Sequence, residues 1–226
     1  MAEERRLLII AGLSAAGKTV VSRELIERSV GFTAIRSMTT RAPRGDGNDN
    51  EYFYLTEEEF YRAIDRGELV EYMNFTDAMY GTPRAELERA HSEGLIPLLV
   101  LDLCGVKSLS HASNYSPCCV FLYEDLNLIE ERLYARYLGV SPTVEGLTAF
   151  TKRKERNISD SLKLPPLADC FYAFVRNRES ISETADEVLR VFGEFCSGVP
   201  RDAAACREAA DMLYASAREK RPADEE

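Results

Sequence analysis

The sequence of 226 residues lacks the features of several protein classes. It has no basic excess: its formal net charge is −10, which argues against broad binding to nucleic acid or anionic membranes, since both need a basic surface. No apolar run approaches the roughly 20 residues of a membrane span. The stretch from Leu7 to Leu13 is interrupted by Gly12 and is too short for a signal peptide. We therefore expect a soluble, cytoplasmic protein with no membrane or nucleic-acid partner.

Metal-binding cysteine patterns and internal repeats are also missing. No two cysteines form a CxxC pair, and His91 and His111 are not near-neighbours of any cysteine at the spacing of a zinc site. The composition, 45% hydrophobic and 29% charged, is that of an ordinary globular protein, and this length can bury a substantial core without disulfides or metals. We expect free, mostly buried thiols in a reducing compartment at Cys104, Cys118, Cys119, Cys170, Cys196 and Cys206.

Alternating apolar and helical segments predict an α/β fold. Four continuous apolar runs suit strands of a parallel sheet covered on both faces, and Thr33–Ser37 is a weaker candidate. Helical periodicity appears in three stretches, and Ser180 with Glu183 resembles a capping box before the last. The predicted strands are Leu7–Ala11, Leu98–Leu101, Cys118–Tyr123 and Phe171–Val175, and the predicted helices are Lys18–Arg28, Asp125–Leu138 and Ser182–Cys196.

Two stretches interrupt this alternation. The first, from about Met38 to Gly94, is turn-rich at its start, then holds a short strand at Tyr52–Leu55 and a helix opened by Thr56 and Glu59. The second, 137–166, is polar and basic and suggests a mobile lid. We expect a core of 1–37, 95–136 and 167–198, an inserted subdomain of 38–94, a lid of 137–166, and a tail of 199–226 that forms a peripheral helix with a frayed acidic end.

Residues 12–19 read Gly-Leu-Ser-Ala-Ala-Gly-Lys-Thr and match the GxxxxGK[ST] phosphate-binding motif in full. Gly12 and Gly17 let the backbone fold tightly, so that successive N–H groups point at phosphate oxygens, and the helix N-terminus adds its positive end. Lys18 is expected to neutralise β- and γ-phosphate charge, and Thr19 to place its hydroxyl on Mg²⁺. The flanking strand and helix disfavour a chance glycine-rich turn. The motif predicts a nucleoside triphosphate site but does not name the acceptor.

Beyond this loop, the sequence resembles the guanylate kinases. The resemblance is carried by Ser37-Met-Thr-Thr-Arg41-Ala-Pro-Arg44, Glu51-Tyr52-Phe53, Leu69-Val70-Glu71-Tyr72 and Tyr80-Gly81-Thr82, which come in the family's order at nearly its spacing. It spans about Leu7 to Phe195 and is strongest from Gly12 to Asp102. It implies the three-layer α/β fold of P-loop NTPases, with a central parallel sheet, the inserted subdomain binding a nucleoside monophosphate, and a lid.

The resemblance also implies roles for individual residues. The acceptor, GMP, would be held at its 5′-phosphate by Arg41, Arg44, Tyr52 and Tyr80, and its guanine would be read by Ser37, Glu71, Thr82 and Asp102. ATP would be bound by Gly12, Ser14, Ala15, Ala16, Gly17, Lys18, Thr19, Val20, Arg132 and Asn177. The catalytic set would be Lys18, Arg41, Arg44, Arg136 and Arg153, with Thr19 on the magnesium ion.

The chemistry of these residues is consistent with such roles. Arg41 and Arg44, three residues apart, can both bind one phosphate dianion. Guanine presents N1–H and N2–H₂ side by side, and a carboxylate accepts both; adenine would leave that carboxylate unpaired, at a cost of about 1–3 kcal/mol. Other interpretations stay open: the arginines as solvated loop charges, Tyr52 and Tyr80 as core aromatics, and Glu71 as an exposed strand-end residue.

The sequence departs from the family's pattern in three places. The family usually carries Asp-x-Asp where this chain reads Val100-Leu-Asp102, so an acid thought to support Mg²⁺ is absent. The spacing in the lid drifts after Arg136, which leaves Lys152, Arg153 and Arg156 as candidates, and Lys163-Leu-Pro-Pro166 has no counterpart. Asn177 resembles the family's adenine-side asparagine on the strength of one residue.

We therefore predict a nucleoside monophosphate kinase that transfers the terminal phosphate of ATP to GMP or dGMP with Mg²⁺, acting on small-molecule nucleotides as a monomer or homodimer. Two alternatives remain. One is a guanylate-kinase-like scaffold with weak or no catalysis, which Val100 and the unusual lid favour. The other is a P-loop kinase for a different small phosphate acceptor. A GTPase or motor ATPase would leave the stretch from Ser37 to Arg44 unused.

Overall fold

The computed structural model describes residues 5–29, 31–43, 49–75, 78–110, 114–139, 141–178 and 180–221. The chain is an α/β protein, as the sequence predicts, and it contains a second sheet that the sequence analysis does not predict. It divides into two compact units, one of residues 1–9 and 25–118, the other of 10–24 and 119–226. This partition passes through strands β1 (Arg6–Gly12) and β8 (Ser116–Tyr123). It differs from the four-part division expected from the sequence, and that division stays a prediction.

The larger sheet contains the four predicted buried strands. Its order is β2-β7-β1-β8-β9, with parallel pairing of β2 with β7 and of β8 with β9. From Leu7 to Ala11 every side chain is fully buried, which explains the unbroken apolar run. The strands are β1 (Arg6–Gly12), β2 (Phe32–Ala34), β7 (Ile96–Val100), β8 (Ser116–Tyr123) and β9 (Ala173–Arg176).

The helices that the periodicity predicts are confirmed to within a residue. Helix α1 spans Lys18–Arg28, α5 spans Leu126–Tyr137 and α7 spans Ile181–Cys196. The Asp125 side chain caps α5 by accepting from the N–H of Asn127. At α7, the side chain of Ser180 accepts from the N–H of Glu183. This hydrogen bond is one of the two that make up the predicted capping box.

The smaller sheet lies in the predicted inserted subdomain. Its order is β4-β3-β6-β5, parallel between β3 and β4 and antiparallel elsewhere. The helix predicted after Thr56 is α2, and Thr56 and Glu59 form a complete capping box. The elements are β3 (Ser37–Thr39), the 3-10 turn η1 (Asp49–Glu51), β4 (Tyr52–Tyr54), α2 (Glu57–Asp65), β5 (Leu69–Phe75), β6 (Ala78–Pro83) and α3 (Arg84–Ser92). The weak strand candidate Thr33–Ser37 is split between β2 and β3.

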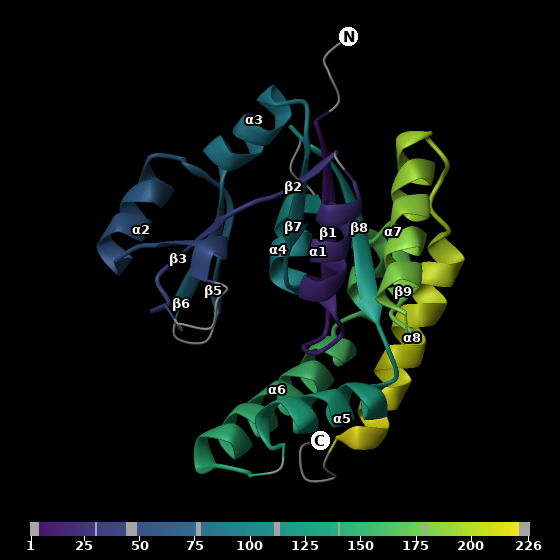
Figure 1. The fold of residues 1–226 in the computed structure, drawn as a ribbon. Helices are drawn as coiled ribbons and strands as arrows, with labels where there is room; N and C mark the ends of the chain where they lie inside the picture. Colours follow the sequence, from purple (N-terminus) through teal and green to yellow (C-terminus); the bar gives the residue numbers. More distant parts are fainter. Residues whose placement is uncertain are drawn as a thin grey trace. The chain divides into compact units, whose positions relative to one another are not determined.

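One face of this smaller sheet is the apolar core of the subdomain. Phe60 and Ala63 of α2 pack against Leu69 and Met79, with Met38 at the edge of the cluster; Figure 1 shows α2 beside these strands. On β3, Ser37 and Thr39 flank Met38, and successive side chains of a strand point to opposite faces. These flanking residues therefore lie on the other face of the sheet, as does Tyr80, which follows Met79 on β6.

A β-bulge in β5 places Leu69 and Glu71, two residues apart, on opposite faces of the sheet. The pairing runs Leu69 with Pro83 and then Glu71 with Thr82, so two steps on β5 match one step on β6. Without the bulge, Leu69 and Glu71 would share a face. With it, Leu69 joins the apolar cluster, and the carboxylate of Glu71 lies on the opposite face with Thr82.

The predicted lid and tail are both helical. Within 137–166 the chain forms α6 (Val144–Leu162), followed by the 3-10 turn η2 (Pro165–Cys170), and its role as a lid stays a prediction. The tail forms α8 (Ala203–Lys220). The predicted helix is present, and one of its faces is buried: Cys206, Ala210 and Leu213 are buried in α8, which contacts α6, η2 and β9. The predicted frayed end, 222–226, lies outside the described residues.

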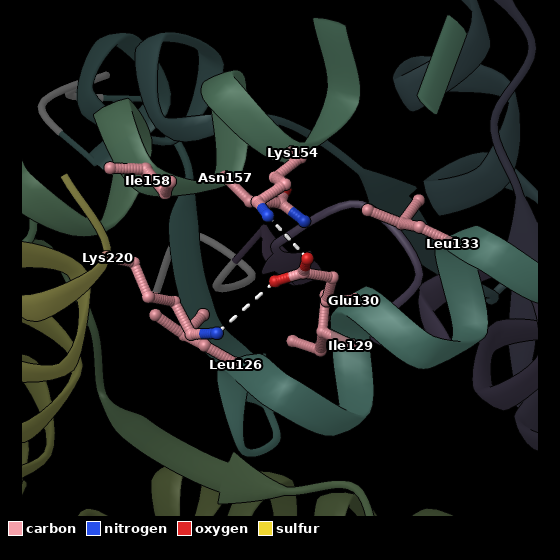
Figure 2. A pocket seen from close by; sticks show the side chains of 8 residues that line it. All are labelled: Leu126, Ile129, Glu130, Leu133, Lys154, Asn157, Ile158 and Lys220. Atoms are coloured by element: carbon pink, nitrogen blue, oxygen red, sulfur yellow. Dashed lines mark hydrogen bonds and ion pairs between the residues drawn. The ribbon is translucent and has the colours of Figure 1, made fainter. Parts of the chain in front are cut away.

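The C-terminal end of α8 is tied to α5 and α6 by charge. Figure 2 shows Glu130 of α5 between Lys154 of α6 and Lys220 of α8, at N–O distances of 2.5 and 3.2 Å. Burial alone would raise the pKa of Glu130, but the hydrogen bonds from the two lysines outweigh it and lower that pKa. The same residues line a small pocket with apolar walls of Leu126, Ile129, Leu133 and Ile158.

The six cysteines all lie in the described part of the chain. None of these six cysteines forms a disulfide, and three of them are buried. Burial raises the pKa of Cys119 to about 12, so that thiol is inert at neutral pH. In the parts of the chain that the structure describes, no helix is both long and apolar enough to cross a bilayer, and no three metal-binding side chains cluster.

Candidate functional site

The residues predicted to bind the acceptor gather on the polar face of the smaller sheet. Strand pairing places Ser37 beside Tyr52, Thr39 beside Tyr80, and Glu71 beside Thr82. Paired residues share a face, and so do residues two apart on one strand. The sheet therefore presents Ser37, Tyr52, Tyr80, Thr82 and Glu71 together, opposite the face that packs on α2.

Glu71 is the buried carboxylate among these side chains. It is 7% exposed, and its Oε1 accepts a hydrogen bond of 2.6 Å from the hydroxyl of Thr82. Burial raises the pKa of Glu71, the Thr82 hydrogen bond opposes that shift, and the nearby charge of Asp102 adds to it. A buried carboxylate that is not held by an arginine or lysine is costly to the fold. The interpretation of Glu71 as an exposed strand-end residue is therefore wrong.

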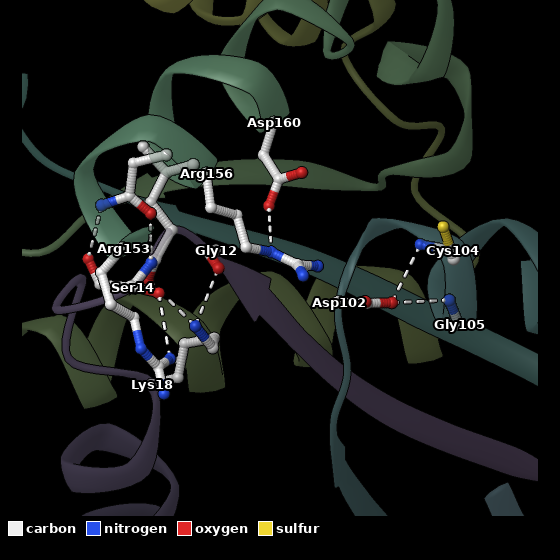
Figure 3. A network of polar contacts seen from close by, with 11 residues as sticks. Gly12, Ser14, Lys18, Asp102, Cys104, Gly105, Arg153, Arg156 and Asp160 are labelled. Atoms are coloured by element: carbon white, nitrogen blue, oxygen red, sulfur yellow. Dashed lines mark hydrogen bonds and ion pairs between the residues drawn. The ribbon is translucent and has the colours of Figure 1, made fainter. Parts of the chain in front are cut away.

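Asp102 stands at the start of helix α4 (Leu103–Ser110). Its Oδ1 accepts from the N–H groups of Cys104 and Gly105, each at 3.0 Å (Figure 3). This arrangement fixes the Asp102 carboxylate by capping the helix. Gly105 leaves room beside Glu71, since a Cβ there would lie 3.5 Å from Glu71 Oε2. Helix α4 thus begins where Glu71 and Asp102 come together.

Arg41 lies beside the rings of two tyrosines, and a third tyrosine ring packs against one of them. Its guanidinium carbon is 5.3 Å from the centre of the Tyr52 ring and 5.8 Å from that of Tyr54, and its Nη2 donates to the Tyr54 hydroxyl at 3.4 Å. The Tyr80 ring meets Tyr52 edge-on at 6.1 Å. Among the described residues Arg41 has no carboxylate partner. A cation beside tyrosine hydroxyls is a suitable receptor for a phosphate group. Arg44 lies outside the described residues.

The phosphate loop adopts a strained conformation fixed by close contacts. Gly12 and Gly17 have φ of +153° and +91°, and Ala15 has φ of +66°, a region that L-residues avoid. A Cβ on Gly12 would lie 2.3 Å from the carbonyl oxygen of Leu122, and one on Gly17 would lie 2.1 Å from Asn177 Nδ2. Both glycines are therefore required by contact as well as by backbone angle.

Two basic side chains converge on this loop, as Figure 3 shows. Lys18 donates to the carbonyl oxygens of Gly12 and Leu13 at 2.8 and 2.9 Å, and Arg153 of α6 donates to the hydroxyl of Ser14 at 3.4 Å. The structure thus brings one predicted lid arginine to the loop. For Arg132 and Arg136 on α5 it records no contact with the loop; Arg136 lies over the Tyr137 ring.

The comparisons with known proteins point to one family. The model of the guanylate kinase family matches residues 4–139. The guanylate kinase of Lactobacillus johnsonii is 35% identical over 208 residues, which cover 89% of this chain and all of that protein.

The chain belongs to the guanylate kinase family. Some relatives are matched over only part of their length: the chain is 37% identical to the guanylate kinase of Wolbachia pipientis over 117 residues, 51% of this chain and 58% of that protein. The crystal structure of guanylate kinase from Anaplasma phagocytophilum has the same fold, with a TM-score of 0.56 at 22% identity over 87% of each chain.

Within this guanylate kinase family member, the structure adds two residues that sequence reasoning missed. Tyr54 lies on the polar face and contacts Arg41; its spacing of two from Tyr52 on a strand was the available signal. Asn157 of α6 pairs with the main chain of Ser14, and a single asparagine in a basic helix carries no sequence signal. Asn177 is buried, and its amide contacts the main chain of the phosphate loop at Ala16.

Proposed function

We propose that the protein is a guanylate kinase, which converts ATP and GMP, or dGMP, to ADP and GDP. The observation that carries this proposal is the buried Glu71 carboxylate on the polar face of the smaller sheet, held on one oxygen by Thr82 and flanked by Asp102. Such an acceptor group, placed at an energetic cost to the fold, is suited to a ligand that brings two adjacent donors.

Guanine meets that requirement. Its N1–H and N2–H₂ would donate to the Glu71 carboxylate, and Asp102, Ser37 and Thr82 supply further polar atoms around the base. Adenine has an acceptor at N1, which would face the carboxylate and leave it unpaired. A buried polar group without a partner costs about 1–3 kcal/mol, which is sufficient to favour GMP over AMP.

The GMP phosphate would bind beside Arg41. The guanidinium offers parallel N–H donors, and Tyr52, Tyr54 and Tyr80 lie on the same face of the sheet. Arg44 is proposed as a second cation, three residues further along the chain. In this scheme the subdomain of 38–94 holds GMP by its base at one end and by its phosphate at the other.

ATP would bind to the phosphate loop. Among the described residues, the main-chain N–H groups of Ala15, Gly17 and Thr19 have no acceptor, as expected of a loop that binds an anion. Lys18 would exchange the carbonyls of Gly12 and Leu13 for phosphate oxygens. Arg132, Arg136 and Arg153 are proposed to add positive charge around the transferring group.

The residues present fit a magnesium ion carried by ATP. Thr19 is exposed and offers a hard hydroxyl oxygen, which Mg²⁺ accepts beside phosphate oxygens and water. When bound, the ion would neutralise charge on the β- and γ-phosphates. Val100, 41% exposed, provides no ligand where the family usually has an acid, so this chain relies on Thr19 and the nucleotide itself.

Phosphoryl transfer between the two nucleotides needs positioning and charge neutralisation more than a base. A phosphate oxygen of GMP is already a nucleophile at neutral pH, so no side chain has to remove a proton. Closure of 137–166 would exclude water, which otherwise competes with GMP as the acceptor. We further propose that the protein acts in the cytoplasm on small-molecule nucleotides, as a monomer or homodimer.

A coupled assay of ADP release tests the proposal. The full chain is supplied with Mg·ATP and, in turn, GMP, dGMP, AMP, CMP and UMP. We expect turnover with GMP well above that with the other ribonucleotides. Reaction without an acceptor measures background hydrolysis, and Lys18→Ala serves as the inactive control. If the wild-type chain turns over GMP no faster than the Lys18→Ala variant, the proposed kinase activity is refuted.

One observation favours the scaffold alternative. Val100 removes the carboxylate expected to support the metal, while the groups proposed to bind GMP are retained. The two alternatives separate in a calorimetric titration with GMP: binding with no turnover supports a scaffold, and binding with turnover supports the kinase. Absence of both would indicate a different acceptor.

A further inference from the structure

We propose that Asn157 and Asn177 are positioning residues that hold the phosphate loop in its binding shape, one on each side of Ala15. The inference rests on the proposed function to the extent that the loop binds a nucleotide phosphate. It assigns a role to Asn157, and it gives Asn177 a role other than contact with adenine.

Asn157 pairs with Ser14 through both ends of its amide. Oδ1 accepts from the Ser14 N–H at 2.8 Å, and Nδ2 donates to the Ser14 carbonyl at 3.0 Å. The two residues are 143 positions apart in the chain, and Asn157 is 4% exposed. An amide that matches one residue's donor and acceptor in this way fixes both the position and the orientation of that peptide unit.

Asn177 holds the other side of the loop. It follows β9, is 5% exposed, and its Nδ2 donates to the Ala16 carbonyl at 2.7 Å. Its Oδ1 accepts from the Thr184 hydroxyl at 3.0 Å, and its main-chain N–H donates to the Tyr123 carbonyl at 2.7 Å. With the amide buried and bonded at both ends, its polar atoms serve the loop and α7.

The residue between the two anchors needs such support. Among the described residues, Ala15 is the non-glycine residue with positive φ, at +66°, a conformation that is unfavourable for an L-residue. Strain of this kind persists only where the surroundings impose it. Asn157 at Ser14 and Asn177 at Ala16 are those surroundings.

The two anchors also leave the anion-binding groups free. Asn157 uses the N–H of Ser14, and Asn177 uses only a carbonyl, so neither competes for the N–H groups of Ala15, Gly17 and Thr19. Because α6 provides Asn157, the helix expected to act as a lid also shapes the loop. The geometry therefore links α6 to triphosphate affinity, separately from any contact of its arginines with phosphate.

The test is nucleotide binding by variants of Asn157, measured by calorimetry with ADP and with inorganic tripolyphosphate. Asn157→Leu removes both hydrogen bonds to the main chain of Ser14, so we expect about tenfold weaker binding of both probes. Leucine suits the apolar lining formed by Leu126, Ile129 and Ile158. The matched control is Asn127→Leu, which removes an amide bonded to Lys220 and should leave both affinities unchanged.

Asn157→Asp gives a readout that loss of folding would not produce. Its carboxylate accepts from Ser14 N–H but cannot donate to the Ser14 carbonyl; once protonated, it does both, as the amide does. Binding by this variant should therefore recover toward wild type as pH is lowered from neutral to mildly acidic, after correction for the wild-type profile. In the kinase assay, Asn157→Leu should raise KM for ATP and leave KM for GMP near wild type.

Asn177→Asp separates loop positioning from adenine contact. If Asn177 acts through Ala16, affinity for tripolyphosphate falls as much as affinity for ADP, since the loss does not involve the base. A loss confined to ADP would overturn the role given to Asn177. Wild-type affinity in Asn157→Leu, or no acid recovery in Asn157→Asp, would overturn the role given to Asn157.

These outcomes are distinguishable from failure of the proposed function. A wild-type protein that binds ADP but does not phosphorylate GMP would refute the kinase and leave the loop anchors testable. A wild-type kinase whose Asn157→Leu variant binds ADP normally would refute the anchors alone. A wild-type protein that binds neither probe would refute both.

Discussion

Replacing Glu71 with glutamine tests the proposed guanine site with a minimal change of shape. In the structure, Glu71 Oε1 accepts from the Thr82 hydroxyl at 2.6 Å, which leaves Oε2 as the freer acceptor for the base. The glutamine amide retains one oxygen and replaces the other with an NH₂ group. If the oxygen stays with Thr82, the NH₂ group faces the donors of guanine, and one hydrogen bond becomes an opposition of two donors.

The expected loss follows from the charge and burial of the contact. A hydrogen bond to a charged group contributes about 1.5–3 kcal/mol, and roughly 1.4 kcal/mol corresponds to tenfold in an equilibrium constant. We therefore expect kcat/KM for GMP to fall at least about tenfold and up to about a hundredfold. The value for AMP should stay level or rise, because the unpaired carboxylate is gone.

Although Glu71→Gln should weaken the use of GMP, it should not lower the stability of the fold. Burial raises the pKa of Glu71 in the folded state, so the folded protein binds this proton more tightly than the unfolded chain. Its ionised form therefore lowers stability at neutral pH, and this loss is relieved as pH falls through the raised pKa. The Glu71→Gln substitution removes the penalty, so the Tm at neutral pH should be unchanged or higher.

The assay compares initial rates with GMP and AMP for wild type and Glu71→Gln, together with thermal unfolding. For wild type, KM for GMP should rise as acid protonates Glu71, beginning at a higher pH than an ordinary glutamate would give, and for Glu71→Gln it should be flatter. Glu68→Gln, a change at an exposed surface pair, is the control. Equal losses with GMP and AMP, or a large fall in Tm, would refute the reasoning.

Three further outcomes follow from the structure. Gly17→Ala forces a Cβ toward Asn177 at positive φ, so we expect stability to fall by about 1–3 kcal/mol and ADP binding to be lost in calorimetry; normal ADP binding would contradict the loop geometry. Val100→Asp should lower the Mg²⁺ concentration for half-maximal turnover. No change in that concentration would show that position 100 does not contribute to Mg²⁺ binding. Thr56→Ala should cost about 1 kcal/mol in thermal unfolding by removing the cap shared with Glu59, with KM for ATP unchanged.

The order of the core elements could be read from the sequence because each segment carries its own pattern. Leu7–Ala11 is apolar throughout because both faces of β1 are covered, and Lys18–Arg28 has helical spacing. The strands β5 and β6 and the helices α3 and α4 carried weaker patterns. In β5 the bulge after Leu69 breaks the alternation that identifies a half-buried strand, and α4 has only eight residues.

Some residues of the candidate site could likewise be predicted from the sequence, and others could not. The phosphate loop and the stretch from Ser37 to Arg44 are local in sequence, so their residue types and spacing were sufficient to nominate them. The sequence alone could not show that Glu71 is buried, that Tyr54 lies beside Arg41, or that α8 packs against α6. These properties depend on strand register and helix packing between segments far apart in the chain.

The sequence by itself therefore determined the fold class, the family, and the residue types available for phosphate and base. Only the tertiary structure decided which side chains share the polar face of the smaller sheet and which asparagines hold the phosphate loop. The physical reason is that a local pattern reports the burial of its own segment. The pairing of Asn157 with Ser14 depends on the packing of two segments that have no common pattern.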